Sequence, residues 1–113
     1  MKEGEIILTP MPQADGKVKN RPAIYLREMP PFRDALVCGV SAQVNQLATD
    51  FDELITSQDS DFSSSGLVKD SLIRLGFLAV LPRRNIIGSI GSISTVRHKR
   101  LLHRLSDYLI EVP

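Results

Sequence analysis

The residues of this sequence best suited to chemistry are an arginine and a serine that the strand pattern brings together. Arg21 opens the run Arg-Pro-Ala-Ile-Tyr-Leu-Arg, and Ser41 closes the run Ala-Leu-Val-Cys-Gly-Val-Ser. A guanidinium is a planar fork of donors that matches phosphate oxygens, while a hydroxyl both donates and accepts hydrogen bonds. Together the two groups could hold a phosphodiester and stabilise the extra charge that forms on it during attack.

The two runs meet if they form an antiparallel pair whose connection is centred on Pro31. Partner residue numbers then sum to 62, and one face becomes apolar, with the pairs Leu26–Leu36, Ile24–Cys38 and Pro22–Val40. A slip of one residue would spoil that face, so the pattern favours this register. The other face then carries the pairs Tyr25–Val37, Ala23–Gly39 and Arg21–Ser41.

A plainer interpretation of the pair stays open. Exposed arginine and serine are common, so on the strand pair alone Arg21 caps a surface strand end and Ser41 merely ends its strand. Other reactive residues offer less: Cys38 falls on the apolar face, and His98 and His103 are five residues apart, so they share no helix face. One cysteine and two histidines argue against a structural zinc site, and we expect no metal or cofactor.

The elements that must position these residues are short strands followed by one helix. Proline pairs and turn residues interrupt the β-rich runs, and we expect Pro10 and Pro12 to end the first strand and residues 10–20 to form an exposed loop. Short strands at this spacing indicate a sandwich or barrel rather than a βαβ sheet. The strands are expected at 4–9, 21–27, 35–41, 71–81 and 86–93, with a possible short strand at 51–56.

The segment from Thr95 to Glu111 contains no glycine or proline and is predicted to be an amphipathic helix with Ser94 as its N-cap. Its basic side chains fall mostly off the apolar face, as on a solvated helix surface. The apolar face comprises Val96, Leu101, Leu102, Leu105, Leu109 and Ile110.

Size and composition describe one domain, residues 1–113, of ordinary globular character, with 42% hydrophobic and 24% charged residues. No apolar run approaches the roughly 20 residues of a membrane span. The single cysteine and the acidic N-terminus, which lacks a signal-peptide pattern, predict a cytoplasmic protein. Residues 62–113 carry eight Lys/Arg against three Asp/Glu, a balance compatible with a polyanion partner or with a solvated helix face.

Several stretches, in order along nearly the whole chain, resemble the MazF/PemK family of toxin endoribonucleases. The resemblance implies an SH3-like β-barrel of the MazF/CcdB plasmid-maintenance-toxin type, mainly β with a C-terminal helix. The matching stretches are Gly4-Glu5-Ile6-Ile7, Asn20-Arg21-Pro22-Ala23-Ile24-Tyr25-Leu26, Val40-Ser41-Ala42-Gln43, Ser65-Gly66-Leu67-Val68-Lys69-Asp70-Ser71-Leu72-Ile73 and Ile90-Gly91-Ser92-Ile93-Ser94.

The resemblance also implies a function: a dimeric toxin of a type II toxin–antitoxin system that cuts single-stranded RNA without a metal and is neutralised by a cognate antitoxin. The family's key arginine matches Arg21, and its key threonine or serine matches Ser41. The ribose 2′-OH would attack the adjacent phosphorus and leave a 2′,3′-cyclic phosphate and a 5′-OH end. Arg21 would stabilise the developing charge and could pass a proton to the leaving oxygen, while Ser41 would hydrogen-bond a phosphate oxygen.

Four further residues are candidates for RNA binding. Lys17 and Lys19 make the first loop basic, which suits a phosphate backbone. Gln43 belongs to a matching stretch. Tyr25 shares the Arg21 face of the strand and could stack a base, with core or interface packing as the alternative.

The sequence departs from the family at two places. Many members carry a Gly-Ser-Glu-Gln-like run in the first loop, where this chain has residues 13–20, Gln-Ala-Asp-Gly-Lys-Val-Lys-Asn, and Ser41 stands where threonine is frequent. An alternative function is therefore a non-catalytic barrel that inhibits a protein target, as gyrase-inhibiting toxins do, or a degenerate toxin; an unrelated housekeeping barrel fits the composition equally well. The apolar residues Leu75, Phe77 and Leu81 exceed what one face can bury and predict a homodimer.

Overall fold

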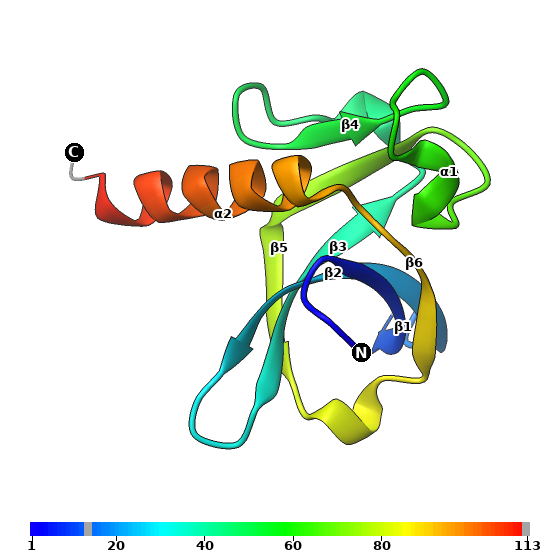
Figure 1. The fold of residues 1–113 in the computed structure, drawn as a ribbon. Helices are drawn as coiled ribbons and strands as arrows, with labels where there is room; N and C mark the ends of the chain where they lie inside the picture. The colour runs from blue at the N-terminus through cyan, green and yellow to red at the C-terminus, as the bar shows by residue number, and fades with distance from the viewer. Residues whose placement is uncertain (13–14, 112–113) are drawn as a thin grey trace.

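The computed structural model describes residues 1–12 and 15–111, and one antiparallel sheet forms most of the molecule. Its strands lie in the order β4-β5-β3-β2-β1-β6, and the sheet curls into a half-barrel with helix α2 (Thr95–Ile110) laid across it (Figure 1). The predicted mainly-β fold with a C-terminal helix is confirmed. The strands are β1 (Glu5–Pro12), β2 (Val18–Met29), β3 (Asp34–Ser41), β4 (Glu53–Ile55), β5 (Ser71–Leu81) and β6 (Gly88–Ser92).

Short helical turns link some of these strands. They are η1 (Val44–Gln46) after β3, α1 (Phe62–Ser65) between β4 and β5, and η2 (Arg83–Asn85) between β5 and β6. The possible strand at 51–56 is present as β4, which pairs with the first residues of β5.

The first hairpin is longer than predicted, because the first strand continues through Pro10, where the sequence predicted its end, and stops at Pro12. β1 pairs with β6 only as far as Leu8, so both prolines lie where the strand has β2 as its single neighbour. The predicted exposed loop at 10–20 is correspondingly short. Gly16, at a φ of 81°, provides its turn, whereas Gln13 and Ala14 lie outside the described residues.

Two apolar clusters fill the two sides of the curled sheet. The larger joins residues from five strands to Leu101 and Leu105 of α2, and it includes Cys38, which is fully buried as predicted. The smaller packs Ile7, Ala23, Tyr25, Ala35 and Val37 beneath the end of β5 and the η2 turn. The alternation of strand side chains between two faces accounts for this division.

Helix α2 begins as predicted, because Ser94 Oγ accepts a hydrogen bond of 3.1 Å from the Arg97 backbone N–H. Its predicted apolar face is only partly covered. Figure 1 shows the helix running out beyond the sheet, and Val96, Leu109 and Ile110 remain about 70% exposed. In the described part of the chain, no helix has the length and apolar character needed to cross a membrane.

Candidate functional site

An open pocket of about 580 Å³ lies where the first hairpin, the end of β3 and the middle of β5 meet. Its volume falls within the range of small-molecule sites. Two arginines, a serine and an aromatic ring lie around it, so it combines positive charge, a hydroxyl and an apolar surface. The lining residues are Met11, Arg21, Gly39, Val40, Ser41, Ala42, Gln43, Gln46, Arg74 and Phe77.

The strand register that motivated the Arg21–Ser41 pair is confirmed over part of its length. Ala23, Ile24 and Tyr25 face Gly39, Cys38 and Val37 as predicted. The predicted Leu26–Leu36 pair is wrong, because a bulge at Leu26 shifts the register and Leu36 faces Arg27 instead. The paired residues end at Ala23–Gly39, short of Arg21 and Ser41, yet both of these side chains line the one pocket.

Local hydrogen bonding orients the serine. Ser41 Oγ accepts a hydrogen bond of 3.0 Å from the Gln43 backbone N–H, in the turn that leads from β3 into η1. A hydroxyl that accepts one bond still carries a proton that it can donate to a ligand oxygen. Gln43 lines the same pocket, so two of the predicted residues on this turn lie together.

Arg21 lies on the long hairpin, directly opposite Thr9 of β1. Among the described residues, Thr9 Oγ1 is a fully buried oxygen without a hydrogen-bond partner, a situation that is uncommon in folded proteins and calls for a functional or solvent explanation. Lys19 faces Met11 two residues farther along the hairpin, and therefore lies on the Arg21 side of the ribbon. Lys19 and Lys17 are both exposed and add positive charge beyond the pocket's own lining.

A bulge in β5 places two residues in the pocket that the sequence did not suggest. Cys38 faces Leu78 but the next residue, Gly39, faces Arg74, so residues 75–77 are looped out of the register. Figure 1 shows β5 changing direction sharply along its length. Arg74 and Phe77 are thereby both brought beside Gly39.

The absence of a side chain at Gly39 leaves room for the Phe77 ring. A Cβ at this position would lie 2.8 Å from Phe77 Cδ1, closer than side-chain atoms can approach, so the ring packs where only a glycine leaves room. The Arg74 guanidinium carbon lies 5.5 Å from the centroid of the same ring, within the range of a cation–π contact. In the sequence, a glycine within a strand indicates that another group packs close to the backbone there, but it does not specify which side chain does so.

The pocket is electrostatically one-sided. It holds Arg21 and Arg74, and none of the described residues that line it is acidic. Such a concentration of one charge sign attracts an anionic group. The arrangement can therefore bind a phosphate through its arginines, offer a hydroxyl from Ser41, and place a planar ring beside them.

Tyr25 does not reach this pocket, so the interpretation in which it stacks a base is not supported. The side chain is 2% exposed and belongs to the smaller apolar cluster. Its hydroxyl accepts a hydrogen bond of 2.9 Å from Arg83 Nη1, and the Arg83 guanidinium lies 5.8 Å from the ring centroid. The alternation of strand side chains predicted the correct side of the sheet for Tyr25, but it could not show that the η2 turn covers the Tyr25 ring.

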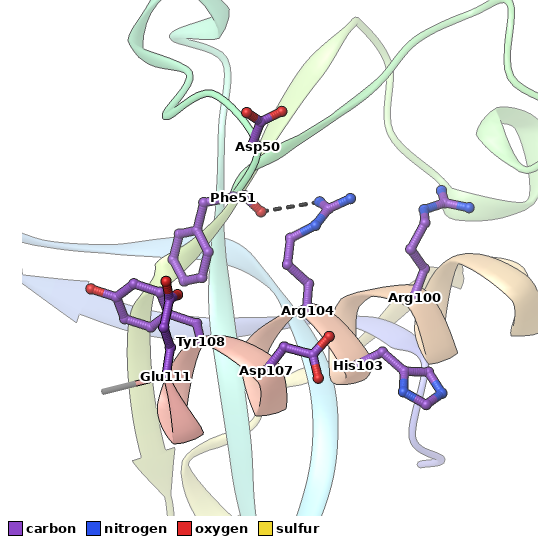
Figure 2. Close-up of a pocket in the computed structure, with 8 residues that line it drawn as sticks. All are labelled: Asp50, Phe51, Arg100, His103, Arg104, Asp107, Tyr108 and Glu111. Carbon is purple, nitrogen blue, oxygen red and sulfur yellow. Dashed lines mark hydrogen bonds between the residues drawn. The ribbon is translucent and has the colours of Figure 1, made fainter. Parts of the chain in front are cut away.

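A second pocket of about 370 Å³ lies between α2 and the segment of Asp50 and Phe51 that precedes β4 (Figure 2), and both of its arginines contact neighbouring residues. Arg104 donates to the Phe51 backbone carbonyl at 3.1 Å, and Arg100 Nε donates to Glu53 at 2.7 Å. The Phe51 and Tyr108 rings contact at 4.8 Å between centroids. These contacts fasten the helix to the segment before β4. The pocket is lined by Asp50, Phe51, Arg100, His103, Arg104, Asp107, Tyr108 and Glu111.

The remaining nucleophile and base candidates serve the fold. Burial raises the pKa of the Cys38 thiol to about 12, so it stays protonated. His98 Nε2 donates to the Leu26 carbonyl at 2.8 Å and thereby ties α2 to β2, while His103 is exposed on the helix. Neither histidine lines the pocket that contains Arg21 and Ser41.

In comparisons with known proteins, no protein-family model matches the chain, and no curated protein sequence matches it.

Proposed function

We propose that this chain is the toxin of a type II toxin–antitoxin system, a metal-independent endoribonuclease of the MazF/PemK type built on an SH3-like barrel. The observation that carries the proposal is the shared pocket of Arg21 and Ser41, which holds a second arginine and, among its described lining residues, no acid. The order of motifs along the sequence and the curled six-stranded sheet with its C-terminal helix support the same assignment.

The proposed reaction is an internal transesterification. The ribose 2′-oxygen forms a bond to the adjacent phosphorus, the bond from phosphorus to the 5′-oxygen breaks, and the proton lost from the 2′-OH is balanced by one gained at the 5′-oxygen. Arg21 stabilises the charge that gathers on the phosphorus oxygens, and Ser41 donates a hydrogen bond to one of them. Each donor aimed at developing charge typically contributes 10²- to 10³-fold in rate.

The test is cleavage of a diverse pool of single-stranded RNA by purified protein in EDTA, with the new 5′ ends sequenced. We expect Arg21→Ala to slow cleavage by about 10²- to 10³-fold. Arg84→Ala is the matched control, because Arg84 is an exposed arginine on η2 outside the pocket. A pool that stays intact with wild-type protein, or an Arg21→Ala variant as fast as Arg84→Ala, contradicts the proposal.

The proposed partners are single-stranded mRNA, a second copy of the chain and an acidic cognate antitoxin, all in the cytoplasm. Leu78 and Val80 of β5 are 40% and 54% exposed, an apolar surface that a second copy would cover. Sedimentation analysis of the purified chain tests the homodimer, and a short acidic protein encoded beside it would supply the antitoxin.

A second candidate is a growth inhibitor that binds a protein target without cutting RNA. The observation that favours it is the uncovered end of α2, where Tyr108, Leu109 and Ile110 are 59%, 69% and 72% exposed. Growth arrest that persists in Arg21→Ala and disappears when Leu109 and Ile110 are replaced by polar residues would select this candidate.

A further inference from the structure

Resting on the proposed function, we propose that Phe77 and Arg74 form a stacking subsite for one unpaired base of the single-stranded substrate. The two residues would select and hold the nucleotide beside the phosphate that Arg21 and Ser41 engage. The inference comes from the looped-out segment of β5, which brings both side chains into the pocket.

The position of the Phe77 ring is the first reason. A phenylalanine on a strand of a small domain normally packs into a core, yet Phe77 is 47% exposed and belongs to neither apolar cluster. The ring packs against the bare backbone of Gly39, so part of it is held by the fold while the rest stays exposed. A half-exposed ring in a positively charged pocket has the features of a surface on which a base can stack.

The guanidinium of Arg74 is the second reason. It lies 5.5 Å from the ring centroid and lines the same pocket. Proteins that bind single strands stack bases both on aromatic rings and on guanidinium planes, and the positive charge also favours the phosphate backbone. Phe77 and Arg74 therefore lie against each other in the pocket, and each is of a type on which a base can stack.

The arrangement of the pocket gives the third reason. Arg21 and Ser41 come from the hairpin and the end of β3, while Phe77 and Arg74 come from β5. A nucleotide has the same division, with a phosphate at one end and a planar base at the other. One pocket thus provides a charged region for the phosphate and an aromatic region for the base.

The test uses a short single-stranded oligodeoxynucleotide that carries 2-aminopurine, because a strand without 2′-OH groups binds without being cut. Stacking quenches 2-aminopurine fluorescence, so the signal reports contact with a ring rather than binding alone. We expect wild-type protein to quench the probe and Phe77→Leu to abolish the quenching and weaken binding roughly 5- to 150-fold, the range expected for losing one base–aromatic stack. Phe77→Tyr, which keeps the ring, should retain both.

Phe32→Leu is the matched control, because Phe32 is 79% exposed in the turn between β2 and β3 and lies outside the pocket. Circular dichroism and urea unfolding of each variant establish that it remains folded. Arg74→Gln should weaken binding and lower the slope of log affinity against log salt by about 1.

The outcomes separate this inference from the proposed function. If Phe77→Leu and Phe32→Leu show equal quenching and affinity while RNA cleavage still depends on Arg21, the base subsite is overturned and the proposed nuclease activity is retained. If quenching depends on Phe77 but no RNA is cleaved, the subsite is supported and the proposed nuclease activity is contradicted. A wild-type protein that fails to bind the oligonucleotide would overturn the subsite, since a surface built for a base must hold one.

Discussion

Arginines in this molecule occur in two different settings, one buried among carboxylates and one exposed in a pocket. The first setting is the α2 cluster, in which the arginines of helix α2 contact two acidic residues: Arg97, Arg100, Arg104, Glu53 and Asp61. Arg97 is 5% exposed, and its guanidinium contacts Asp61 and Glu53 at 2.8 Å each. In the pocket, Arg21 and Arg74 are exposed, and the described lining around them contains no carboxylate. The first setting neutralises charge inside the fold, whereas the second places exposed arginines at a pocket that an anion can enter.

The α2 cluster joins three parts of the chain at one point. Arg97 also donates to the Leu54 backbone carbonyl at 3.1 Å, and Arg100 and Arg104 contact the same Glu53 carboxylate at 2.7 and 3.1 Å. The cluster therefore holds α2 against β4 and the segment before α1. A buried charge with several hydrogen-bonded partners is tolerated because its lost hydration is replaced by those bonds.

The sharpest test of the comparison is removal of one arginine from each setting. Arg97→Ala leaves the buried Asp61 without its main partner and removes one of the three arginines that contact Glu53. We expect it to lower the free energy of unfolding by about 3–5 kcal/mol. Arg74→Ala removes an exposed side chain and should change it by less than about 0.5 kcal/mol. Urea unfolding monitored by circular dichroism measures the unfolding free energy of both variants. Similar losses of stability in the two variants would contradict the distinction between the two settings.

Acid should weaken the α2 cluster. Burial raises the pKa of Glu53, but the hydrogen bond from Arg100 and the charges of Arg100, Arg104 and Arg97 outweigh burial and hold that pKa below its usual value. Burial likewise raises the pKa of Asp61, and the Arg97 side chain and the Ser94 backbone N–H reverse the effect. A carboxyl whose pKa is lower when folded stabilises the fold above its unfolded pKa, and this contribution is lost as pH falls through the folded value.

We therefore expect the urea midpoint to fall as the pH drops below about 4, the usual range of carboxyl pKa values. Glu53→Gln removes one of the two titrating groups, so its midpoint should be lower at pH 7 and should change less between pH 7 and pH 3. An equally steep decline in wild type and Glu53→Gln would place the acid sensitivity elsewhere in the molecule.

A substitution in the pocket itself should lower stability only modestly. A Cβ at Gly39 meets the Phe77 ring, so Gly39→Ala should displace the ring at a cost of about 1 kcal/mol in unfolding free energy. Its main consequence should be weaker binding of single-stranded nucleic acid. Gly88→Ala is the control, because a Cβ there meets nothing within 4 Å. Equal affinities for the two variants would show that Gly39 does not set the position of the ring.

Much of the fold could be predicted because it depends on local pattern. The alternation of apolar residues in β2 and β3 specified three of their cross-strand pairs, and the Ser94 cap followed from the residue type that opens a helix. The predicted end of the first strand at Pro10 was wrong because a proline's effect depends on whether a second strand needs its missing N–H. That information lies in the topology rather than in the neighbouring residues.

The parts of the site that escaped prediction are those that depend on distant segments. Arg97 falls off the apolar face of its helix, which suggests solvent exposure, but it is buried by Glu53 and Asp61, which lie 44 and 36 residues away. Arg74 and Phe77 enter the pocket through a bulge that no local signal locates. For Tyr25, the sequence predicted the correct side of the strand but could not show that the η2 turn covers the side chain.

The position of β1 in the sheet has a consequence for how the chain acquires its structure. β1 lies between β2, its neighbour in the chain, and β6, which begins at Gly88. The described residues that line the pocket all come before residue 78, but the core beneath the sheet is completed by Leu101 and Leu105. Non-local pairings of this kind form slowly, because a long loop must close before its contacts compensate the lost entropy. We therefore expect a growing chain on the ribosome to carry the described pocket residues before its core is complete, and the pocket to become competent only once helix α2 has emerged.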